Sequence, residues 1–370
     1  MNRIKKLVDH GQAVWLDFIR RDILVNGELE RLIAEDGVSG VTSNPAIFQQ
    51  AIGDSAEYDG DLQVLLAEAS DSTSMELYEA IAIADIRMAA DQLAPTYRQT
   101  EGRDGFVSLE VSPHLARDTA ATAAEARRLW QRVDRPNLMI KIPATPEGLP
   151  AVEQVLSEGV NVNITLMFSL DHYEAVAQAY LGALAKCPRP QSLASVASFF
   201  VSRVDTMTDG LLEEIGSEEA LSLRGRIAIA NSKLAYQRFR ELFHGPAFVD
   251  WRRQGVGVQR VLWASTSTKN PSYRDVIYVE ELVGPETVNT VPPSTLEAFG
   301  DHGEVRDSLT DGLDQANEDL QRLAALGIDL DFVTEELQRE GIDKFAQPFD
   351  RLLETLEQKR SSLQAAESAG

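Results

Sequence analysis

The sequence predicts an α/β protein built as a (β/α)8 TIM barrel with additional helices. Short apolar runs rich in β-branched and aromatic residues alternate with longer segments whose apolar residues recur about every 3.6 positions. Buried strands that alternate with helices are typical of parallel βα units, and eight such strands fit a closed barrel. The length of 370 residues is enough for one large domain with a sizeable core.

The eight candidate strands follow one another along the chain. In order, they are AVWLDF (13–18), GVTS (40–43), FVSLEV (106–111), LMIKIP (138–143), NVNITL (161–166), LASVAS (193–198), RVLWAS (260–265) and ETVNTV (286–291). The segments between them have helical spacing, for example DTAATAAEARRLWQRV (118–133) and SLDHYEAVAQAYLGALAKC (169–187).

Three regions hold more helix than a barrel needs. The interval 44–104 is mostly helical in pattern and predicts extra helices inserted after the second strand. Residues 206–258 hold more than one helix, and the acidic tail 304–367 is helical, with FDRLLETLEQKRSSLQ (349–364) as its clearest amphipathic part. No linker, internal repeat or low-complexity block divides the chain. We therefore expect residues 1–370 to form one barrel domain with these helices added.

Composition argues against several classes of partner. The formal net charge of −23 repels nucleic-acid phosphates and anionic membranes, so we expect neither as a partner. No apolar run is long enough to cross a bilayer, and MNRIKKLVDHGQ (1–12) lacks the apolar core of a signal peptide. The single cysteine, Cys187, forms no internal disulfide, which fits a reducing cytoplasm. These features predict a cytoplasmic protein.

Metal and nucleotide sites are equally unexpected. The five histidines are not paired at metal-ligand spacing, and no CxxC motif is present. The glycine-rich fingerprints of nucleotide binding are also absent from the sequence. We therefore expect no metal and no cofactor.

Polar side chains stand at or near the ends of seven predicted strands. In a (β/α)8 barrel the carboxyl ends of the strands carry the active site. Buried polar groups cost free energy unless they have partners, so their recurrence at this edge points to a binding or catalytic site. The side chains are Asp17, Thr42, Asn44, Glu110, Lys141, Asn163, Thr165, Ser198 and Ser265.

Structural roles also explain these residues one at a time. Asn44 could cap the helix that begins PAIF, and Asp17 could cap the helix after the first strand. Glu110 and Lys141 could form a buried structural ion pair, or Lys141 could extend its ammonium to the barrel mouth without chemistry. The residues by themselves leave these alternatives open.

Lys141 lies in the apolar run LMIKIPAT (138–145), and this setting suggests chemistry. Burial disfavours the charged form of a lysine, and a neutral amine is a nucleophile that forms a Schiff base with a carbonyl. Two carboxylates within reach, those of Asp17 and Glu110, could divide the general acid and base work. A carboxylate too close to the amine would favour its charged form again, so the distance between them matters.

Five motifs together resemble the transaldolases. GVSGVTSNPAIFQQAI (37–52) resembles the N-terminal signature of that family, and LMIKIPAT resembles the segment with its Schiff-base lysine. GVNVNITLMFS (159–169), SVASFFVSRVD (195–205) and RVLWASTSTKNP (260–271) follow in the order of the family. The resemblance covers roughly residues 12–300 and is nearest to the longer bacterial branch. DKFAQPFDRLLETL (343–356) is similar to the closing helix of the family, although it is less diagnostic.

The resemblance implies a role for each catalytic side chain. Lys141 would attack the C2 ketone of a ketose phosphate, and Glu110 with Thr165 would hold the water that carries protons while the carbinolamine dehydrates. Asp17 would take the proton of the C4 hydroxyl as the C3–C4 bond breaks. A dihydroxyacetone unit would stay on Lys141 as an enamine and then add to an incoming aldose phosphate.

The resemblance also implies the substrate-binding side chains. Asn44 and Asn163 would hydrogen-bond the hydroxyls of the three-carbon unit, with support from Thr42 and Ser198. A separate set would hold the phosphate, and it consists of Arg203 and Ser265.

The phosphate set departs from the commoner family pattern Ala-Ser-x-Arg. This chain reads Ala264-Ser265-Thr266-Ser267, so Ser267 stands at the arginine position. Lys269 could supply the missing charge, or it could be a solvated loop lysine.

The implied activity is that of a transaldolase in the non-oxidative pentose phosphate pathway. Such an enzyme joins sedoheptulose 7-phosphate and glyceraldehyde 3-phosphate to give erythrose 4-phosphate and fructose 6-phosphate. A fructose 6-phosphate aldolase would use the same lysine but release dihydroxyacetone, and a non-catalytic barrel would only bind sugar phosphates. The complete set of Asp17, Glu110 and Lys141 favours catalysis, and a metal-dependent aldolase is disfavoured because no histidine cluster is present. The sequence leaves the oligomeric state open, and a homo-oligomer is one of the alternatives.

Overall fold

The strands close into a barrel in the order in which they occur in the sequence. The computed structural model describes residues 2–53 and 55–369, the last four of these by their backbone alone. Eight parallel strands each pair with their sequence neighbours, and β8 pairs with β1. The strands are β1 (Gln12–Leu16), β2 (Val38–Val41), β3 (Phe106–Glu110), β4 (Leu138–Pro143), β5 (Val162–Met167), β6 (Ser195–Phe200), β7 (Arg260–Ala264) and β8 (Thr287–Val291). The predicted (β/α)8 barrel is thus confirmed, and no strand end moves by more than two residues from its prediction.

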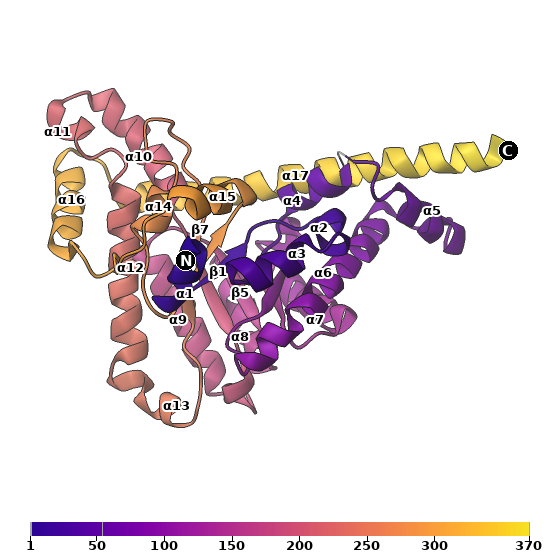
Figure 1. The fold of residues 1–370 in the computed structure, drawn as a ribbon, viewed down its shortest axis with the longest axis horizontal. Coiled ribbons are helices and arrows are strands. Elements are labelled where there is room, and N and C mark those ends of the chain that lie inside the picture. The colour runs from indigo at the N-terminus through magenta and orange to yellow at the C-terminus, as the bar shows by residue number, and fades with distance from the viewer. Residues whose placement is uncertain (1, 54, 370) are drawn as a thin grey trace.

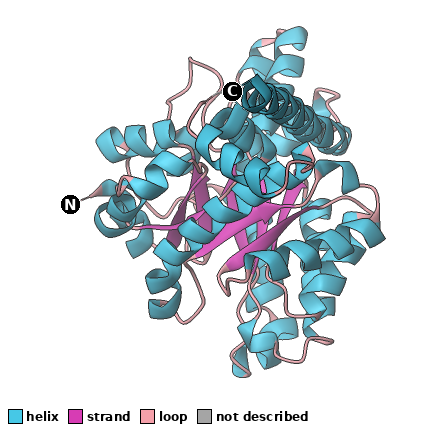
Figure 2. Cartoon of the chain, turned by 90° about the vertical axis from the view of Figure 1, so that its right-hand side faces the viewer, coloured by secondary structure: helices cyan, strands magenta, loops and turns pink. Residues whose placement is uncertain are grey.

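Helices surround this barrel, and Figure 2 shows the strands at the centre of the molecule with the helices around them. The letter η marks short 3₁₀- or π-helical turns among them. In chain order they are α1 (Arg3–Asp9), α2 (Arg21–Val25), α3 (Glu28–Arg31), η1 (Leu32–Asp36), α4 (Pro45–Phe48), η2 (Gln49–Gly53), α5 (Asp59–Glu68), α6 (Ser74–Gln99), η3 (Pro113–Leu115), α7 (Thr119–Val133), α8 (Gly148–Ser157), α9 (Leu170–Leu184), η4 (Pro190–Ser192), α10 (Ser202–Ile215), α11 (Glu218–Leu221), α12 (Ile227–His244), η5 (Pro246–Phe248), α13 (Val249–Arg253), α14 (Ile277–Glu280), α15 (Pro293–His302), α16 (Leu313–Ala325) and α17 (Leu330–Ala369).

Local sequence fixes where several of these helices begin. A capping box starts α6, because Thr73 and Glu76 each bond the backbone N–H of the other. The side chains of Asp118 and Ser169 accept bonds from the first turns of α7 and α9. Each cap gives a partner to N–H groups that a helix start otherwise leaves free, so the helix can begin shortly after its strand ends.

The register of the central strands brings polar residues into one layer. Glu110 on β3 pairs with Lys141 on β4, and Lys141 pairs with Asn163 on β5. Side chains alternate between the two faces of a strand, so these three side chains share the inner face of the barrel. Parallel pairing therefore assembles a lysine, a carboxylate and an amide near the carboxyl ends of the strands.

The long C-terminal helix reaches back over the barrel. Gln338 on α17 donates from Nε2 to the carbonyl oxygens of Ala144 and Leu166, at 3.1 and 2.9 Å, just beyond β4 and within β5. In Figure 1 the rest of α17, in yellow, passes α4 and α5 and ends beyond the body of the molecule.

The interval 44–104 holds α4, α5 and α6, and the tail holds α16 and α17. That the whole chain forms one domain stays a prediction.

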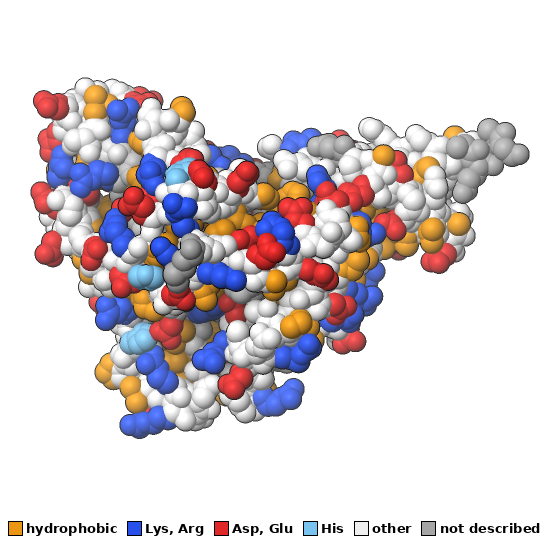
Figure 3. Space-filling model, viewed as in Figure 1, with side chains coloured by type: hydrophobic (Ala, Val, Ile, Leu, Met, Phe, Trp, Pro, Cys, Tyr) orange, Lys and Arg blue, Asp and Glu red, His pale blue; other side chains and the backbone are white. Residues whose placement is uncertain are grey.

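The surface carries charges of both signs. Acidic and basic side chains are interspersed over the face shown in Figure 3, although the formal net charge is −23. Within residues 2–53 and 55–369, no helix has the length and apolar character needed to cross a membrane.

Candidate active site

A cavity of about 580 Å³ opens at the carboxyl ends of the barrel strands. Every predicted site residue except Glu110 lines it, and Glu110 contacts Lys141 from the neighbouring strand. Its volume suits a sugar phosphate. The lining side chains used below are Asp17, Thr42, Asn44, Lys141, Asn163, Thr165, Ser198, Phe200, Arg203, Ser265, Ser267, Lys269, Thr290 and Phe345.

Lys141 projects from β4 into this cavity and is 6% exposed. Its Nζ atom donates to the carbonyl oxygen of Ser43 at 3.3 Å and lies 3.3 Å from Oε2 of Glu110. The ring of Phe345 lies 5.3 Å from the same nitrogen. The ion pair left open by the sequence therefore exists, and its lysine lines a cavity large enough for a substrate.

Glu110 is almost completely buried behind that lysine. In the described part of the chain, neither of its carboxylate oxygens has a hydrogen bond of good geometry, so its contact with Lys141 is one of charge. Burial raises the pKa of Glu110 to about 6, although the charge of Lys141 opposes this shift. Glu110 can therefore accept or donate a proton near neutral pH.

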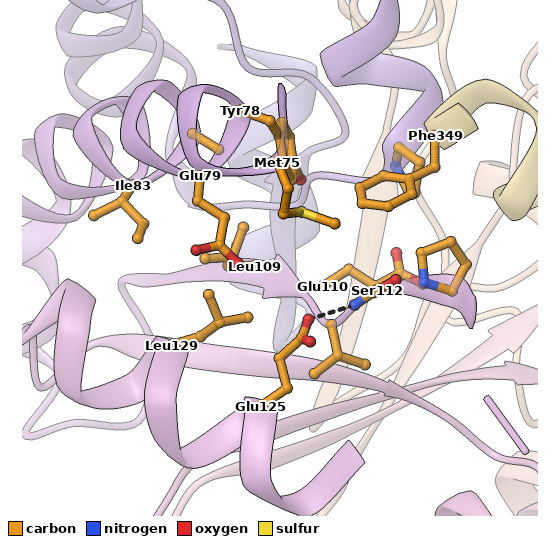
Figure 4. A pocket seen from close by; sticks show the side chains of 14 residues that line it. Met75, Tyr78, Glu79, Ile83, Leu109, Glu110, Ser112, Glu125, Leu129 and Phe349 are labelled. Carbon is orange, nitrogen blue, oxygen red and sulfur yellow. Dashed lines mark hydrogen bonds between the residues drawn. The ribbon is translucent and has the colours of Figure 1, made fainter. Parts of the chain in front are cut away.

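A second, much smaller cavity lies on the other side of Glu110, between β3 and the helices α6 and α7. Figure 4 shows it with Tyr78, Glu79 and Phe349 around it, and with the carboxylate of Glu125 accepting a bond from the backbone N–H of Ser112. Its volume of about 20 Å³ is that of a single water molecule. A sugar phosphate does not fit there, so the larger cavity is the candidate site.

Asp17 follows β1 and faces the larger cavity. Thr42 donates from Oγ1 to Oδ1 of Asp17 at 2.7 Å, and the hydroxyl oxygens of Thr42 and Thr290 are also 2.7 Å apart. The single proton of Thr42 goes to Asp17, so Thr290 is the donor in the second bond. Asp17 does not cap the next helix, since the cap position of α2 is Arg20. This chain of hydroxyls fixes the orientation of the Asp17 carboxylate.

Asn163 is held in one orientation by two serines. Its Nδ2 atom donates to Oγ of Ser108 at 3.0 Å, and Ser198 donates to its Oδ1 atom at 2.6 Å. Two residues further along β5, the hydroxyl of Thr165 is buried and has no hydrogen-bond partner among the described residues. Thr165 is therefore the lining hydroxyl on β5 that stays available to a bound molecule.

Asn44 caps a helix, as predicted, and also lines the cavity. Its Oδ1 atom accepts a bond from the backbone N–H of Ile47 at 3.0 Å and so caps α4. The same side chain lines the cavity, and the cap bond does not use its Nδ2 donor. The structural role predicted from the sequence thus leaves a hydrogen-bond donor for a substrate hydroxyl.

Positive charge gathers at one end of the cavity. Arg203 lies in the first turn of α10, with its guanidinium 5.2 Å from the ring of Phe200 and 5.8 Å from that of Phe345. Its Nη1 atom is buried and, within the described ranges, makes no hydrogen bond. Burial lowers the pKa of Arg203, and the charges of carboxylates oppose this shift. An arginine with a free, desolvated donor is suited to a phosphate.

The loop after β7 completes this end of the cavity. Ser265 adopts a left-handed backbone conformation with φ of 57°, and its hydroxyl lies 2.9 Å from that of Ser202. Lys269 lines the rim and donates from Nζ to the hydroxyl of Ser267 at 2.6 Å. Loss of hydration at the rim and the charge of Arg203 lower the pKa of Lys269. Lys269 thus lies beside the serine that replaces the family arginine.

The lining residues that the sequence reasoning missed include Thr290, Phe200 and Phe345. Thr290 stands near the end of the eighth strand. A polar residue near a strand end is the same sequence signal that identified the residues on the other seven strands. Phe200 lies two residues after Ser198, which places it on the same face of β6. Phe345 comes from the motif DKFAQPFDRLLETL on α17, and nothing in that motif alone places it beside Lys141.

The arrangement suits carbonyl chemistry on an anionic substrate. A buried amine, a carboxylate with a pKa of about 6 and a second, oriented carboxylate meet in one site. Such a set can form an imine and move protons around it. In the part of the chain that the structure describes, no group of His, Cys, Asp or Glu is arranged to hold a metal ion.

Comparison with known proteins agrees with the resemblance seen in the motifs. The model of the transaldolase/fructose-6-phosphate aldolase family matches residues 14–356. The transaldolase of Thiobacillus denitrificans is 49% identical over 359 residues, which cover 95% of this chain and 99% of that protein. Transaldolase 2 of Nostoc punctiforme is 46% identical over 373 residues, or 97% of each chain. The transaldolase of Thermobifida fusca is 47% identical over 361 residues, which cover 96% of this chain and 98% of that protein.

The family match extends past the five motifs to the C-terminal helix, which contacts Lys141 and Arg203 through Phe345. This match and the relatives that are nearly half identical over almost the full length show that this chain belongs to the transaldolase/fructose-6-phosphate aldolase family.

Proposed function

We propose that this chain is a transaldolase, a transferase that moves a dihydroxyacetone unit from a ketose phosphate to an aldose phosphate through a Schiff base on Lys141. The observation that carries the proposal is the buried Lys141 amine, which faces a cavity and touches Glu110, whose pKa is about 6. The positive charges of Arg203 and Lys269 at one end of the cavity suit the phosphate of such a substrate.

The first step is imine formation. Glu110 takes a proton from the ammonium of Lys141, and the neutral amine attacks the C2 ketone of sedoheptulose 7-phosphate or fructose 6-phosphate. Glu110 and the hydroxyl of Thr165 then hold a water that carries protons while the carbinolamine loses its hydroxyl. The raised pKa of Glu110 and the unpartnered hydroxyl of Thr165 support this assignment.

The second step is carbon–carbon cleavage. The protonated imine accepts the electrons of the C3–C4 bond as that bond breaks, and Asp17 takes the proton of the C4 hydroxyl. C4 becomes the aldehyde carbon of an aldose phosphate, which leaves the site. The bond from Thr42 that orients Asp17 supports this role. The enamine then adds to glyceraldehyde 3-phosphate or erythrose 4-phosphate, Asp17 returns the proton, and hydrolysis frees the new ketose.

Binding of the sugar is divided between two groups. Asn44 and Asn163 hydrogen-bond the hydroxyls of the three-carbon unit, and their fixed amides support this division. Thr42 and Ser198 hold Asp17 and Asn163 in place. The phosphate is bound by residues at the positive end of the cavity, namely Arg203, Ser265 and Lys269.

Transfer is proposed in preference to simple release because the relatives at 46 to 49% identity are named transaldolases.

We further propose a cytoplasmic location, supported by the lone buried thiol of Cys187. Sedimentation of the purified protein is the direct measurement of the oligomeric state, which the sequence leaves open between a monomer and a homo-oligomer.

Borohydride trapping tests the central proposal. The protein is incubated with fructose 6-phosphate, reduced and digested, and the modified peptide is identified by mass. A reduced three-carbon adduct on Lys141 is expected, and Lys233, which is 7% exposed and 3.3 Å from Glu281, is an internal control that stays unmodified. No adduct on any lysine of the folded protein would instead indicate a non-catalytic barrel. Dependence of product formation on an added aldose phosphate then separates transfer from aldolase activity.

A further inference from the structure

The C-terminal helix places one aromatic ring between the two cations of the active site. Phe345 on α17 is 6% exposed and lines the large cavity. Its ring lies 5.3 Å from Nζ of Lys141 and 5.8 Å from the guanidinium carbon of Arg203. It therefore contacts both the group that forms the Schiff base and the group that faces the phosphate.

The position of this ring is fixed by contacts one and two turns earlier in α17. Gln338 is buried and bonds the carbonyl oxygens of Ala144 and Leu166. Gly341 packs directly against Leu166, since a Cβ atom there would lie 2.8 Å from Cδ2 of that leucine. Leu166 has a left-handed φ of 62°, a backbone conformation that persists only where the surrounding structure fixes it. The barrel thus holds Phe345 over Lys141.

A ring in this position has two physical effects. It stabilises a cation near its face, which includes a protonated imine on Lys141. It also replaces water with apolar surface beside the reacting atoms. The second effect matters most for an enamine, because its fate depends on what reaches C3.

Two reactions compete for that carbon. In transfer, C3 of the enamine forms a bond to the aldehyde carbon, and the aldehyde oxygen gains a proton. In release, C3 instead takes a proton, the resulting iminium adds water at C2, and the C–N bond breaks to give dihydroxyacetone and the free amine of Lys141. Water that reaches the enamine therefore diverts the enzyme from transfer to release.

We propose that Phe345 sets the partition between transfer and release by keeping water from the enamine on Lys141. Phe345 is in this sense a specificity-determining residue, supplied by the C-terminal helix and not by the barrel strands. The inference rests on the proposed transaldolase function.

The test compares Phe345→Ala with Phe349→Ala, one turn later on the same helix. Phe349 is 2% exposed and packs edge-to-face on Tyr78 with ring centroids 5.4 Å apart, beside the small cavity of Figure 4. Both variants lose a buried ring, but only the first loses one that contacts Lys141. The quantity measured is dihydroxyacetone released per dihydroxyacetone transferred, with fructose 6-phosphate as donor and erythrose 4-phosphate as acceptor.

Phe345→Ala should raise this ratio about tenfold or more, while borohydride still traps an adduct on Lys141. Phe349→Ala should leave the ratio unchanged, even if it lowers the melting temperature or the overall rate. An unchanged ratio in Phe345→Ala, or an equal rise in both variants, would overturn the inference. If the alanine variants do not fold, the same comparison between Phe345→Leu and Phe349→Leu decides it.

Failure of the underlying function is recognised separately, in the wild-type protein. If that protein traps no adduct and transfers nothing, the proposed function and the inference fall together. If it traps and transfers normally but Phe345→Ala keeps its ratio, only the inference falls.

Discussion

Two buried lysines in this chain look alike at first. Lys141 on β4 and Lys233 on α12 are 6% and 7% exposed. Each places its Nζ atom 3.3 Å from a glutamate oxygen, that of Glu110 for Lys141 and that of Glu281 for Lys233. Burial and a neighbouring carboxylate are therefore not enough to identify a reactive lysine.

The two pairs differ in how completely they are satisfied. Lys233 donates to Glu281 and also, at 3.0 Å, to the carbonyl oxygen of Asp311, and the side chain of Glu281 is still 27% exposed. Glu110 is only 4% exposed and, within the described ranges, lacks a well-formed hydrogen bond. Lys141 also lines the large cavity, and Lys233 is not among the residues that line it. A complete set of partners indicates a structural pair, and an incomplete set beside a cavity indicates a site for chemistry.

The largest expected difference between the two lysines is in turnover. Lys141→Ala should lower transaldolase turnover by roughly 10⁴-fold or more, because no covalent intermediate can form. It should cost little stability, since Glu110 already has a pKa of about 6 and can become neutral by taking a proton. Steady-state kinetics and denaturant unfolding of the purified variant measure the two effects.

Lys233→Ala is the matched control for this variant. It removes two bonds from a buried ammonium and should cost about 1–3 kcal/mol of unfolding free energy, with turnover per folded molecule unchanged. Transfer activity retained by Lys141→Ala would contradict the mechanism. Comparable loss of turnover in both variants would show that the comparison between the two pairs is wrong.

Asp17 is the second carboxylate of the Lys141 site. Asp17→Ala should still form the imine, because Lys141 and Glu110 are intact, but cleavage should slow by about 10²- to 10⁴-fold. Borohydride should therefore trap the uncleaved six-carbon sugar on Lys141 in place of the three-carbon unit. Cleavage at the wild-type rate would mean that another group is the base.

Glu110 should give the site a pH dependence that Glu281 does not give. Below pH 6, Glu110 becomes protonated and cannot accept the ammonium proton of Lys141, so kcat/KM should fall about tenfold per pH unit. Glu110→Gln should lower activity and remove this inflection, and Glu281→Gln should keep it. An inflection near pH 6 that persists in Glu110→Gln would assign it to another group.

The same group should affect stability in the opposite direction to activity. Burial raises the pKa of Glu110 from 4.5 to about 6, so the folded state binds its proton more tightly than the unfolded state. Its contribution to the unfolding free energy therefore increases as the pH falls from about 6 to 4.5, and is least favourable above pH 6. Glu110→Gln should remove this part of the pH dependence in denaturant unfolding.

The fold was readily predicted because it depends on local patterns. Eight apolar runs separated by helical spacing are sufficient to indicate the barrel, and parallel register then brings Glu110 beside Lys141. Polar residues at strand ends predicted most of the polar residues that line the cavity, for the same reason. Thr290 lies near the end of the eighth strand and also lines the cavity, so the same reasoning holds for this strand, to which the sequence analysis did not apply it.

What the sequence could not predict depends on distance and docking. The 3.3 Å contact between Lys141 and Glu110 decides whether they interact, and no sequence pattern contains it. Phe345 and Gln338 reach the site only because α17 folds back over strands that precede it by more than 150 residues. An amphipathic pattern predicts a helix but not the surface on which it docks.

A third lysine, Lys269, extends the comparison, and its substitution has the smallest expected effect on activity. It lies at the rim, bonded to Ser267 and close enough to Arg203 for their charges to interact. Lys269→Met should raise the KM for fructose 6-phosphate about three- to tenfold with little change in kcat, because a partly exposed charge contributes modestly to phosphate binding. Adding Ser267→Arg to that variant should lower the KM again, since it restores a charge at the family position. If Lys269→Met leaves the KM unchanged, Lys269 is a solvated loop lysine, and Arg203 and Ser265 hold the phosphate without it.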